Sequence, residues 1–169
     1  MPAKRSSSKV PDAATACLDY EFRQRFRVPA AKSFRWCLDF SPNDVALSAG
    51  HVSRAVTWTS PRTLILDDRF QKPNGERVHK VKLVQVYPEN RSWVSTHIAG
   101  PMRHSQFRYQ IVPDGANASA LIFQGRELRW QGRKLTAAAT RKLAQQVCRE
   151  DSGSWQEFAA AMESDPSVR

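Results

Sequence analysis

The chain has 169 residues, of which 41% are hydrophobic and 25% are charged, and its formal net charge is +10. Its eight Phe, five Trp and three Tyr exclude a disordered chain, and no apolar stretch reaches the roughly 20 residues that a membrane-spanning helix needs. The positive charge requires that nucleic acid or another anionic partner be considered.

The first 17 residues bear Ser and Pro together with Lys4, Arg5 and Lys9, and we expect them to form a disordered basic leader. No apolar segment follows as an export signal requires, so we expect a cytoplasmic protein. A single domain is predicted over residues 18–165, with a tail over 166–169. The other cations are scattered singly, which predicts no specific nucleic-acid partner and only weak contact with anionic surfaces. The oligomeric state stays open.

The three cysteines, Cys17, Cys37 and Cys148, are widely spaced and form no C-x-x-C pair. This spacing predicts small buried side chains rather than a zinc site or a redox pair. We therefore expect neither a metal nor a cofactor.

The first predicted strand covers Leu18–Val28, where apolar and charged residues alternate. Its apolar face carries Leu18, Tyr20, Phe22, Phe26 and Val28. Pro29 ends this strand and favours a short helix over Ala30–Leu38. A second short helix is predicted from Ser41 to Leu47, because a cap-type residue is followed by a proline that suits the first helical position.

Six further strands are predicted between His51 and Trp130, where apolar runs are separated by turn signals containing Pro, Asn and Gly. They cover Ser53–Thr59, Thr63–Phe70, Arg77–Tyr87, Trp93–Ala99, Ser105–Val112 and Ala118–Trp130. The connections are too short for parallel crossovers, so these strands form an antiparallel meander, and the first strand can close one edge.

The C-terminal part changes to a helical pattern. Residues 136–150 are good helix formers, and Ser154 to Glu157 match a capping box that opens a second helical segment. Gly153 marks either a kink in one helix or a break between two. The apolar face of the second segment carries Trp155, Phe158, Ala159 and Met162. We expect this face to pack on the concave side of the sheet, against Phe22, Phe26, Phe107, Tyr109 and Ile111.

This order of elements resembles that of the START-related, polyketide-cyclase-like superfamily, whose members have the helix-grip fold. The resembling segments are Phe26-Arg-Val-Pro-Ala, Phe34-x-Trp-x-x-Asp39-Phe, Arg91-x-Trp93, Gly100-Pro101, Phe107-Arg-Tyr109 and Trp155-x-x-Phe158 with Glu163. The resemblance implies an α+β domain in which a curved antiparallel sheet of about seven strands wraps a long C-terminal helix. It also implies a pocket between sheet and helix that binds lipids, isoprenoids or polyketide-like molecules, with catalysis in a minority of members.

The aromatic and inward-facing residues of such a domain are the candidate ligand-binding residues. They are Phe22, Phe26, Trp58, Trp93, His97, Phe107, Tyr109, Phe123, Trp155 and Phe158. The same side chains are also what an ordinary hydrophobic core would contain.

Candidate catalytic residues are fewer, because the common hydrolase, kinase and metalloprotease motifs are missing. His97 shares a strand face with Trp93, and it is an acid or base candidate if that face is concave; a structural histidine is the alternative. Tyr109 and Glu127 are the other two candidates. We expect Glu127 and Arg126 to be exposed cross-strand partners, since an unpaired buried ion is costly. His51, His79 and His104 are expected to be exposed.

We therefore favour a binding or carrier protein for a small hydrophobic or amphipathic ligand. The alternative is an aromatase/cyclase-type enzyme that moves protons with His97, Tyr109 or Glu127. A basic adaptor for nucleic acid or an anionic membrane is a third hypothesis. Two or more ionisable side chains converging inside the cavity would favour the enzyme.

Overall fold

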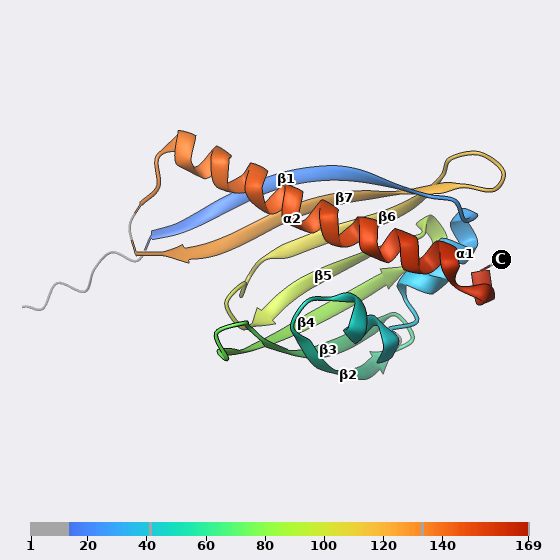
Figure 1. Ribbon diagram of the computed structural model, residues 1–169, viewed down its shortest axis with the longest axis horizontal. Helices are drawn as coiled ribbons and strands as arrows, with labels where there is room; N and C mark the ends of the chain where they lie inside the picture. Colours follow the sequence, from blue (N-terminus) through green and yellow to red (C-terminus); the bar gives the residue numbers. More distant parts are fainter. Residues whose placement is uncertain (1–13, 41, 133, 169) are drawn as a thin grey trace, which may run out of the picture.

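The computed structural model describes residues 14–40, 42–132 and 134–168 (Figure 1). Its elements are β1 (Ala14–Phe26), α1 (Ala30–Cys37), η1 (Pro42–Leu47), β2 (His51–Ser60), β3 (Thr63–Gln71), β4 (Arg77–Tyr87), η2 (Pro88–Asn90), β5 (Ser92–Ala99), β6 (Gln106–Pro113), β7 (Ser119–Gln131), α2 (Ala137–Ser164) and η3 (Pro166–Val168). Each predicted strand is therefore present, with ends that differ by a few residues.

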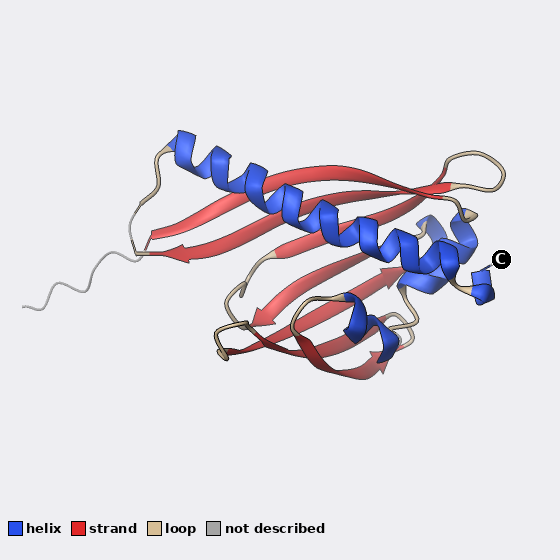
Figure 2. Ribbon diagram, viewed as in Figure 1, coloured by secondary structure: helices blue, strands red, loops and turns tan. Residues whose placement is uncertain are grey.

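The strands form one seven-stranded antiparallel sheet in the order β1-β7-β6-β5-β4-β3-β2. Strands β2 to β7 form a meander. Strand β1 is added at the β7 edge and pairs with β7 along its whole length, from Ala14 opposite Gln131 to Phe26 opposite Ser119. Figure 2 shows α2 lying diagonally across the sheet, with α1 beside its C-terminal end and η1 on the β2 side of the sheet. The predicted α+β architecture, a curved sheet around a long C-terminal helix, is confirmed.

Helix α2 runs without interruption from Ala137 to Ser164, so Gly153 neither breaks nor divides it. The predicted capping box at Ser154 is wrong, because the Ser154 hydroxyl donates to the Glu150 carbonyl of the preceding turn. The N-cap is Thr136, whose side chain accepts a hydrogen bond from the Ala139 amide. A helical glycine costs about 1 kcal/mol relative to alanine, which the burial of residues on both sides of Gly153 outweighs.

The core lies between the concave face of the sheet and α2. A larger cluster includes Phe26, Phe123, Ala159 and Met162, and a smaller one joins Ala16 and Leu18 of β1 to Val147 of α2. The predicted apolar stripe on the second half of α2 is thereby confirmed, with Ala159 and Met162 buried and Trp155 packed against the larger cluster.

Gly125 of β7 makes room for the ring of Tyr20 on the neighbouring strand. A Cβ atom at Gly125 would lie 2.8 Å from Tyr20 Cζ, closer than real contacts allow. With that space free, the Tyr20 hydroxyl donates to Asp151 Oδ2 at 2.5 Å and links β1 to α2. Burial and Asp151 raise the pKa of Tyr20, so its proton stays in this hydrogen bond.

Both predicted chain ends need correction. The leader is predicted to reach residue 17, but β1 begins at Ala14. Ala16 faces inward and continues the alternation of the strand, but its small side chain gives no clear hydrophobic signal in the sequence. Residues 1–13, with Lys4, Arg5 and Lys9, lie outside the described residues. At the other end, Pro166–Val168 form η3 and Val168 is buried, so these residues are part of the domain rather than a tail.

Candidate functional site

A cavity of about 220 Å³ lies between the concave face of the sheet and the second half of α2. Its lining residues come from α1, η1, strands β2 to β6, and α2. Many of its side chains fall into two groups by the elements that carry them, one group on β5, β6 and α2 and the other on η1, β2 and β4. One is aromatic, and the other is ionisable.

The aromatic wall consists of four residues that the sequence analysis selected: Trp93, Tyr109, Trp155 and Phe158. The register of β5 and β6 places Trp93 opposite Tyr109, and their rings stack with centroids 4.8 Å apart. Trp155 lies 5.9 Å from Tyr109 and 5.3 Å from Phe158, again between ring centroids. Strand pairing and the helical stripe thus bring together side chains from three elements.

Helix α1 adds Trp36 and Cys37 to the lining. It is held against the sheet by Ser33, whose buried hydroxyl lies 2.8 Å from Ser119 Oγ of β7 and donates to the Val28 carbonyl at 3.2 Å. Burial raises the pKa of the Cys37 thiol, so this cysteine is protonated and contributes an apolar surface.

The ionisable wall consists of Asp44, His51, Arg54 and Lys82, and three of these contact Asp68 of β3, which is fully buried and is not itself among the lining residues. Lys82 Nζ lies 2.6 Å from Asp68 Oδ2, and Arg54 Nε donates to Oδ1 at 2.7 Å. Arg54 also reaches Asp44 of η1, with Nη1 3.4 Å from Oδ2. His51 Nε2 lies 3.2 Å from Asp68 Oδ1. Five charged or titratable side chains from four elements are therefore in contact, and four of them line the cavity.

These contacts set the charges of the wall. Burial alone would raise the pKa of Asp68, but Lys82 and Arg54 outweigh it and hold the value at about 2. Burial, reinforced by Asp39, raises the pKa of Asp44 to about 6 despite the opposing effect of Arg54. Burial also lowers the pKa of His51. At neutral pH, Asp68 is therefore ionised and His51 is uncharged.

Among the described residues, His51 Nδ1 has no hydrogen-bond partner, and Ser95 Oγ lies close to the Tyr109 side chain without a hydrogen bond of good geometry. Burial raises the pKa of Tyr109, and the nearby Ser95 partly offsets this effect. The Tyr109 hydroxyl and Ser95 thus form a neutral polar spot beside the aromatic wall. Buried polar groups are nearly always paired, so unpaired ones in a cavity wall indicate where a bound molecule could place its own polar groups.

A second, wider groove of about 950 Å³ adjoins the cavity, and Phe70 lines both. Phe70 lies between the His51 ring, stacked at 4.5 Å, and Lys80 Nζ, 4.6 Å from its centroid. Glu127 and Arg129 lie next to each other on one face of β7, line this groove and form an ion pair.

Glu127 is only 1% exposed, so its expected role as an exposed cross-strand partner is wrong. Odd-numbered residues of β7 face inward, and Arg129 two residues further along the same face compensates the buried charge. Arg126 points outward, is exposed and pairs with Asp19 of β1 at 2.7 Å, as expected.

The other predicted ligand-binding residues lie outside the cavity lining. Phe22, Phe26, Phe107 and Phe123 belong to or pack on the core behind the aromatic wall. His97 is buried on the concave face, edge-on to Phe107, and burial together with Lys82 and Lys80 lowers its pKa to about 3. It is not among the described residues that line the cavity or the groove. Trp58, on the edge strand β2, is 52% exposed and stands apart from this set.

The expectation that His51 is exposed is wrong, since its side chain is 1% exposed. It follows a loop in the sequence, but η1 folds back over the start of β2 and Phe70 covers one face of its ring. Sequence reasoning also missed Asp44, Arg54, Asp68 and Lys82. A signal existed for Asp68, because it continues the inward alternation of Leu64, Leu66 and Phe70.

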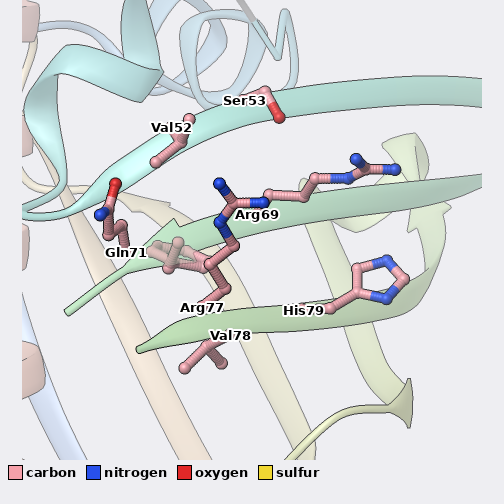
Figure 3. Close-up of a pocket in the computed structure, with 8 residues that line it drawn as sticks. Val52, Ser53, Arg69, Gln71, Arg77, Val78 and His79 are labelled. Atoms are coloured by element: carbon pink, nitrogen blue, oxygen red, sulfur yellow. The ribbon is translucent and has the colours of Figure 1, made fainter. Parts of the chain in front are cut away.

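A third pocket, of about 510 Å³, lies at the corner formed by β2, β3 and β4. Figure 3 shows Arg69, Arg77 and His79 projecting from neighbouring strands around it. His79 pairs with Asp67 at 2.7 Å. Cations that the sequence analysis treats as scattered are thus grouped at this corner.

The sequence matches no model of a known protein family. No curated protein is significantly similar to it in sequence. Solved structures are similar in fold. The Zhui aromatase/cyclase from Streptomyces sp. R1128 superposes with a TM-score of 0.69 at 13% identity, over 87% of this chain and 94% of that one.

Two further structures agree with this similarity. Ara h 8.0201 gives a TM-score of 0.68 at 11% identity, over 88% of this chain and 99% of that one. A START superfamily protein from Mycobacterium smegmatis gives 0.63 at 13% identity, over 86% and 99%. The chain has the helix-grip fold. The helix-grip expectation of the sequence analysis is thereby confirmed, and the cavity occupies the space between the gripping sheet and the helix.

Within the described residues, no helix has the length and apolar character to cross a membrane, and no group of three or more His, Cys, Asp or Glu side chains is placed to bind a metal ion.

Proposed function

We propose that this protein binds a small amphipathic ligand in the 220 Å³ cavity of its helix-grip domain. The observation that carries the proposal is the division of the cavity into an aromatic wall and an ionisable wall with unpaired polar atoms. Burial of apolar ligand surface would provide most of the binding free energy, and Ser95, Tyr109 and His51 would orient the polar end.

The size of the cavity limits the ligand. A cavity of about 150 Å³ is enough for benzene, so 220 Å³ suits a substituted single ring or a short chain. A long lipid would have to extend past Phe70 into the 950 Å³ groove. A polyketide-like or isoprenoid molecule of modest size fits the inner cavity best.

An acid/base enzyme is the second candidate function, because Asp44, His51, Arg54 and Lys82 all line the cavity. Asp44, with a pKa of about 6, and uncharged His51 could exchange protons with a substrate near neutral pH. Turnover of the molecule that the cavity retains would distinguish an enzyme from a carrier.

Native mass spectrometry of protein purified gently from its own cells tests the binding proposal. We expect a retained small molecule, lost in Ser95→Leu, whose side chain would fill the cavity, and kept in Thr96→Leu, which places the same side chain on the opposite face of β5. The retained molecule at a hundred times its Kd should raise Tm by about 5–10 °C. The proposal would be contradicted if the native mass of the purified protein equalled that of the polypeptide alone and no compound of a broad ligand panel raised Tm.

We also propose a reducing intracellular location. Cys17, Cys37 and Cys148 are all free thiols, and disulfides are the rule for cysteines in oxidising compartments. Labelling of thiols in freshly lysed cells should find all three reactive after unfolding.

A further inference from the structure

His51 and Asp68 form a buried pair that the sequence analysis did not select. The His51 ring stacks on Phe70, and its Nε2 donates to the Ser53 carbonyl at 3.1 Å while lying 3.2 Å from Asp68 Oδ1. A carbonyl and an ionised carboxylate can only accept hydrogen bonds, so both neighbours require a proton on Nε2. The geometry therefore selects one tautomer of the neutral ring.

The surroundings keep His51 neutral at physiological pH. Burial lowers its pKa most strongly; Asp68 raises it, and Arg54 and Lys82 lower it again. With the only proton on Nε2, Nδ1 has a free lone pair. That atom is buried and has no partner among the described residues, although the residue lines the cavity.

None of the described neighbouring groups donates a hydrogen bond to this acceptor. Arg54 and Lys82 are donors and already point at Asp68, and Asp68 itself is surrounded by three partners. The His51 Nδ1 atom is thus an unsatisfied acceptor on a residue that lines the same cavity as the aromatic residues.

We propose that His51 Nδ1 accepts a hydrogen bond from a hydroxyl group of the ligand, and that the ligand class is a hydroxylated single aromatic ring with a short apolar substituent. This inference rests on the proposed function. The ring would contact Trp93 and Trp155, and the hydroxyl would complete the otherwise unpaired imidazole. Asp68 acts only as a positioning residue, since it fixes the tautomer through Nε2.

The test compares 4-propylphenol with 4-propyltoluene, in which a methyl group replaces the hydroxyl at similar volume. Their Kd values are measured by calorimetry on the full chain, for the wild type and for His51→Phe. The ratio of the two Kd values should favour the phenol at least about tenfold more in the wild type than in the variant, because tenfold corresponds to about 1.4 kcal/mol, the size of one good hydrogen bond. His79→Phe, an exposed histidine exchanged in the same way, should leave the ratio unchanged.

A second readout does not depend on the stability of His51→Phe. Nitrogen-15 NMR of the wild-type imidazole should show Nε2 protonated and Nδ1 bare, and 4-propylphenol alone should shift the Nδ1 resonance. His51→Asn, which keeps an acceptor near the Nδ1 position, should retain part of the preference. The Asp44 carboxyl in the same cavity has a pKa of about 6. All measurements are therefore made at pH 8, where Asp44 is ionised and the His51 imidazole is uncharged.

Equal ratios in the wild type and His51→Phe, or a proton on Nδ1 in the free protein, would overturn the inference and leave the binding proposal intact. Failure of both probes to bind would overturn the ligand class, whereas the binding proposal is judged by the retained mass. A retained molecule without any hydroxyl group would also refute the inference.

Discussion

Asp68 is the residue on which the ionisable wall depends. A carboxylate that is fully buried is tolerated only when cations and hydrogen bonds replace its lost hydration. Arg54 and Lys82 supply that compensation from the two flanking strands. Removal of the carboxylate takes the counter-charge from Lys82 and leaves Arg54 with its longer contact to Asp44, at 3.4 Å.

We predict that Asp68→Asn lowers the free energy of unfolding by about 3–5 kcal/mol, the usual cost of removing one partner from a buried ion pair. Denaturant unfolding measures this value. Asp67→Asn on the same strand is the matched control, since Asp67 is partly exposed and pairs with the exposed His79; it should change stability by less than about 1 kcal/mol. Equal effects of the two variants would mean that the buried cluster adds nothing specific.

The same carboxylate also sets a pH dependence. Its pKa is about 2 in the folded protein and 3.8 ordinarily, so folding favours the ionised form. This contribution, on the order of 2 kcal/mol, is complete above about pH 4 and is lost as the pH falls towards 2. The wild type should lose this increment on acidification, and Asp68→Asn should not.

At this scale the sequence predicted the aromatic wall better than the ionisable one. Trp93, Tyr109, Trp155 and Phe158 were found because large apolar side chains at periods of two and four mark a core, and here the core lines the cavity. Asp68 and Lys82 interrupt that apolar pattern. A charged residue on an inward face can be assigned a role only when its partners on other strands are known, and the sequence does not give those partners.

At the scale of elements, α2 closes the cavity and completes the core. Trp155 contacts Phe26 and Tyr109, while Met162 is fully buried. The sequence predicted this stripe but not the continuity of the helix. Gly153 and Ser154 are typical of a helix boundary, whereas the packing of the flanking turns on the sheet favours one continuous helix.

We predict that a chain ending at Gly153 unfolds or remains loosely packed and does not bind ligand. It loses Trp155, Phe158 and Met162, together on the order of 5 kcal/mol or more, from a domain that is stable by about 5–15 kcal/mol in total. Thermal unfolding followed by near-ultraviolet circular dichroism measures the effect.

As single changes, Trp155→Ala should cost about 3 kcal/mol and Glu157→Ala, on the exposed side of the helix, less than about 0.5 kcal/mol. If the truncated chain melted within a few degrees of the full one, α2 would be a surface element and the cavity would lack its closing wall.

At the scale of the whole molecule, the net charge is +10, and some of the surface cations are paired with carboxylates while others are not. Arg23 and Arg25 of β1 both contact Asp114, at 3.1 and 2.9 Å. Arg69 and Arg77 lie together at the β2–β4 corner (Figure 3), and neither forms an ion pair with another described residue. A side-chain cation that binds a phosphate releases counterions from the polyanion, and a cation already paired with a carboxylate releases fewer.

We predict weak, non-specific binding of polyanions through this corner. For a 20-nucleotide single strand, each phosphate contact contributes about −0.7 to the slope of log K against log salt concentration, so loss of two contacts should flatten the slope by about 1.4. The double variant Arg69→Gln, Arg77→Gln should show that change between 50 and 200 mM salt by fluorescence anisotropy. The double variant Arg23→Gln, Arg25→Gln removes the same charge from paired sites and should change the slope less. Equal changes would indicate that the whole basic surface binds uniformly, and sequence-selective binding that persists at 200 mM salt would favour the adaptor hypothesis over the carrier.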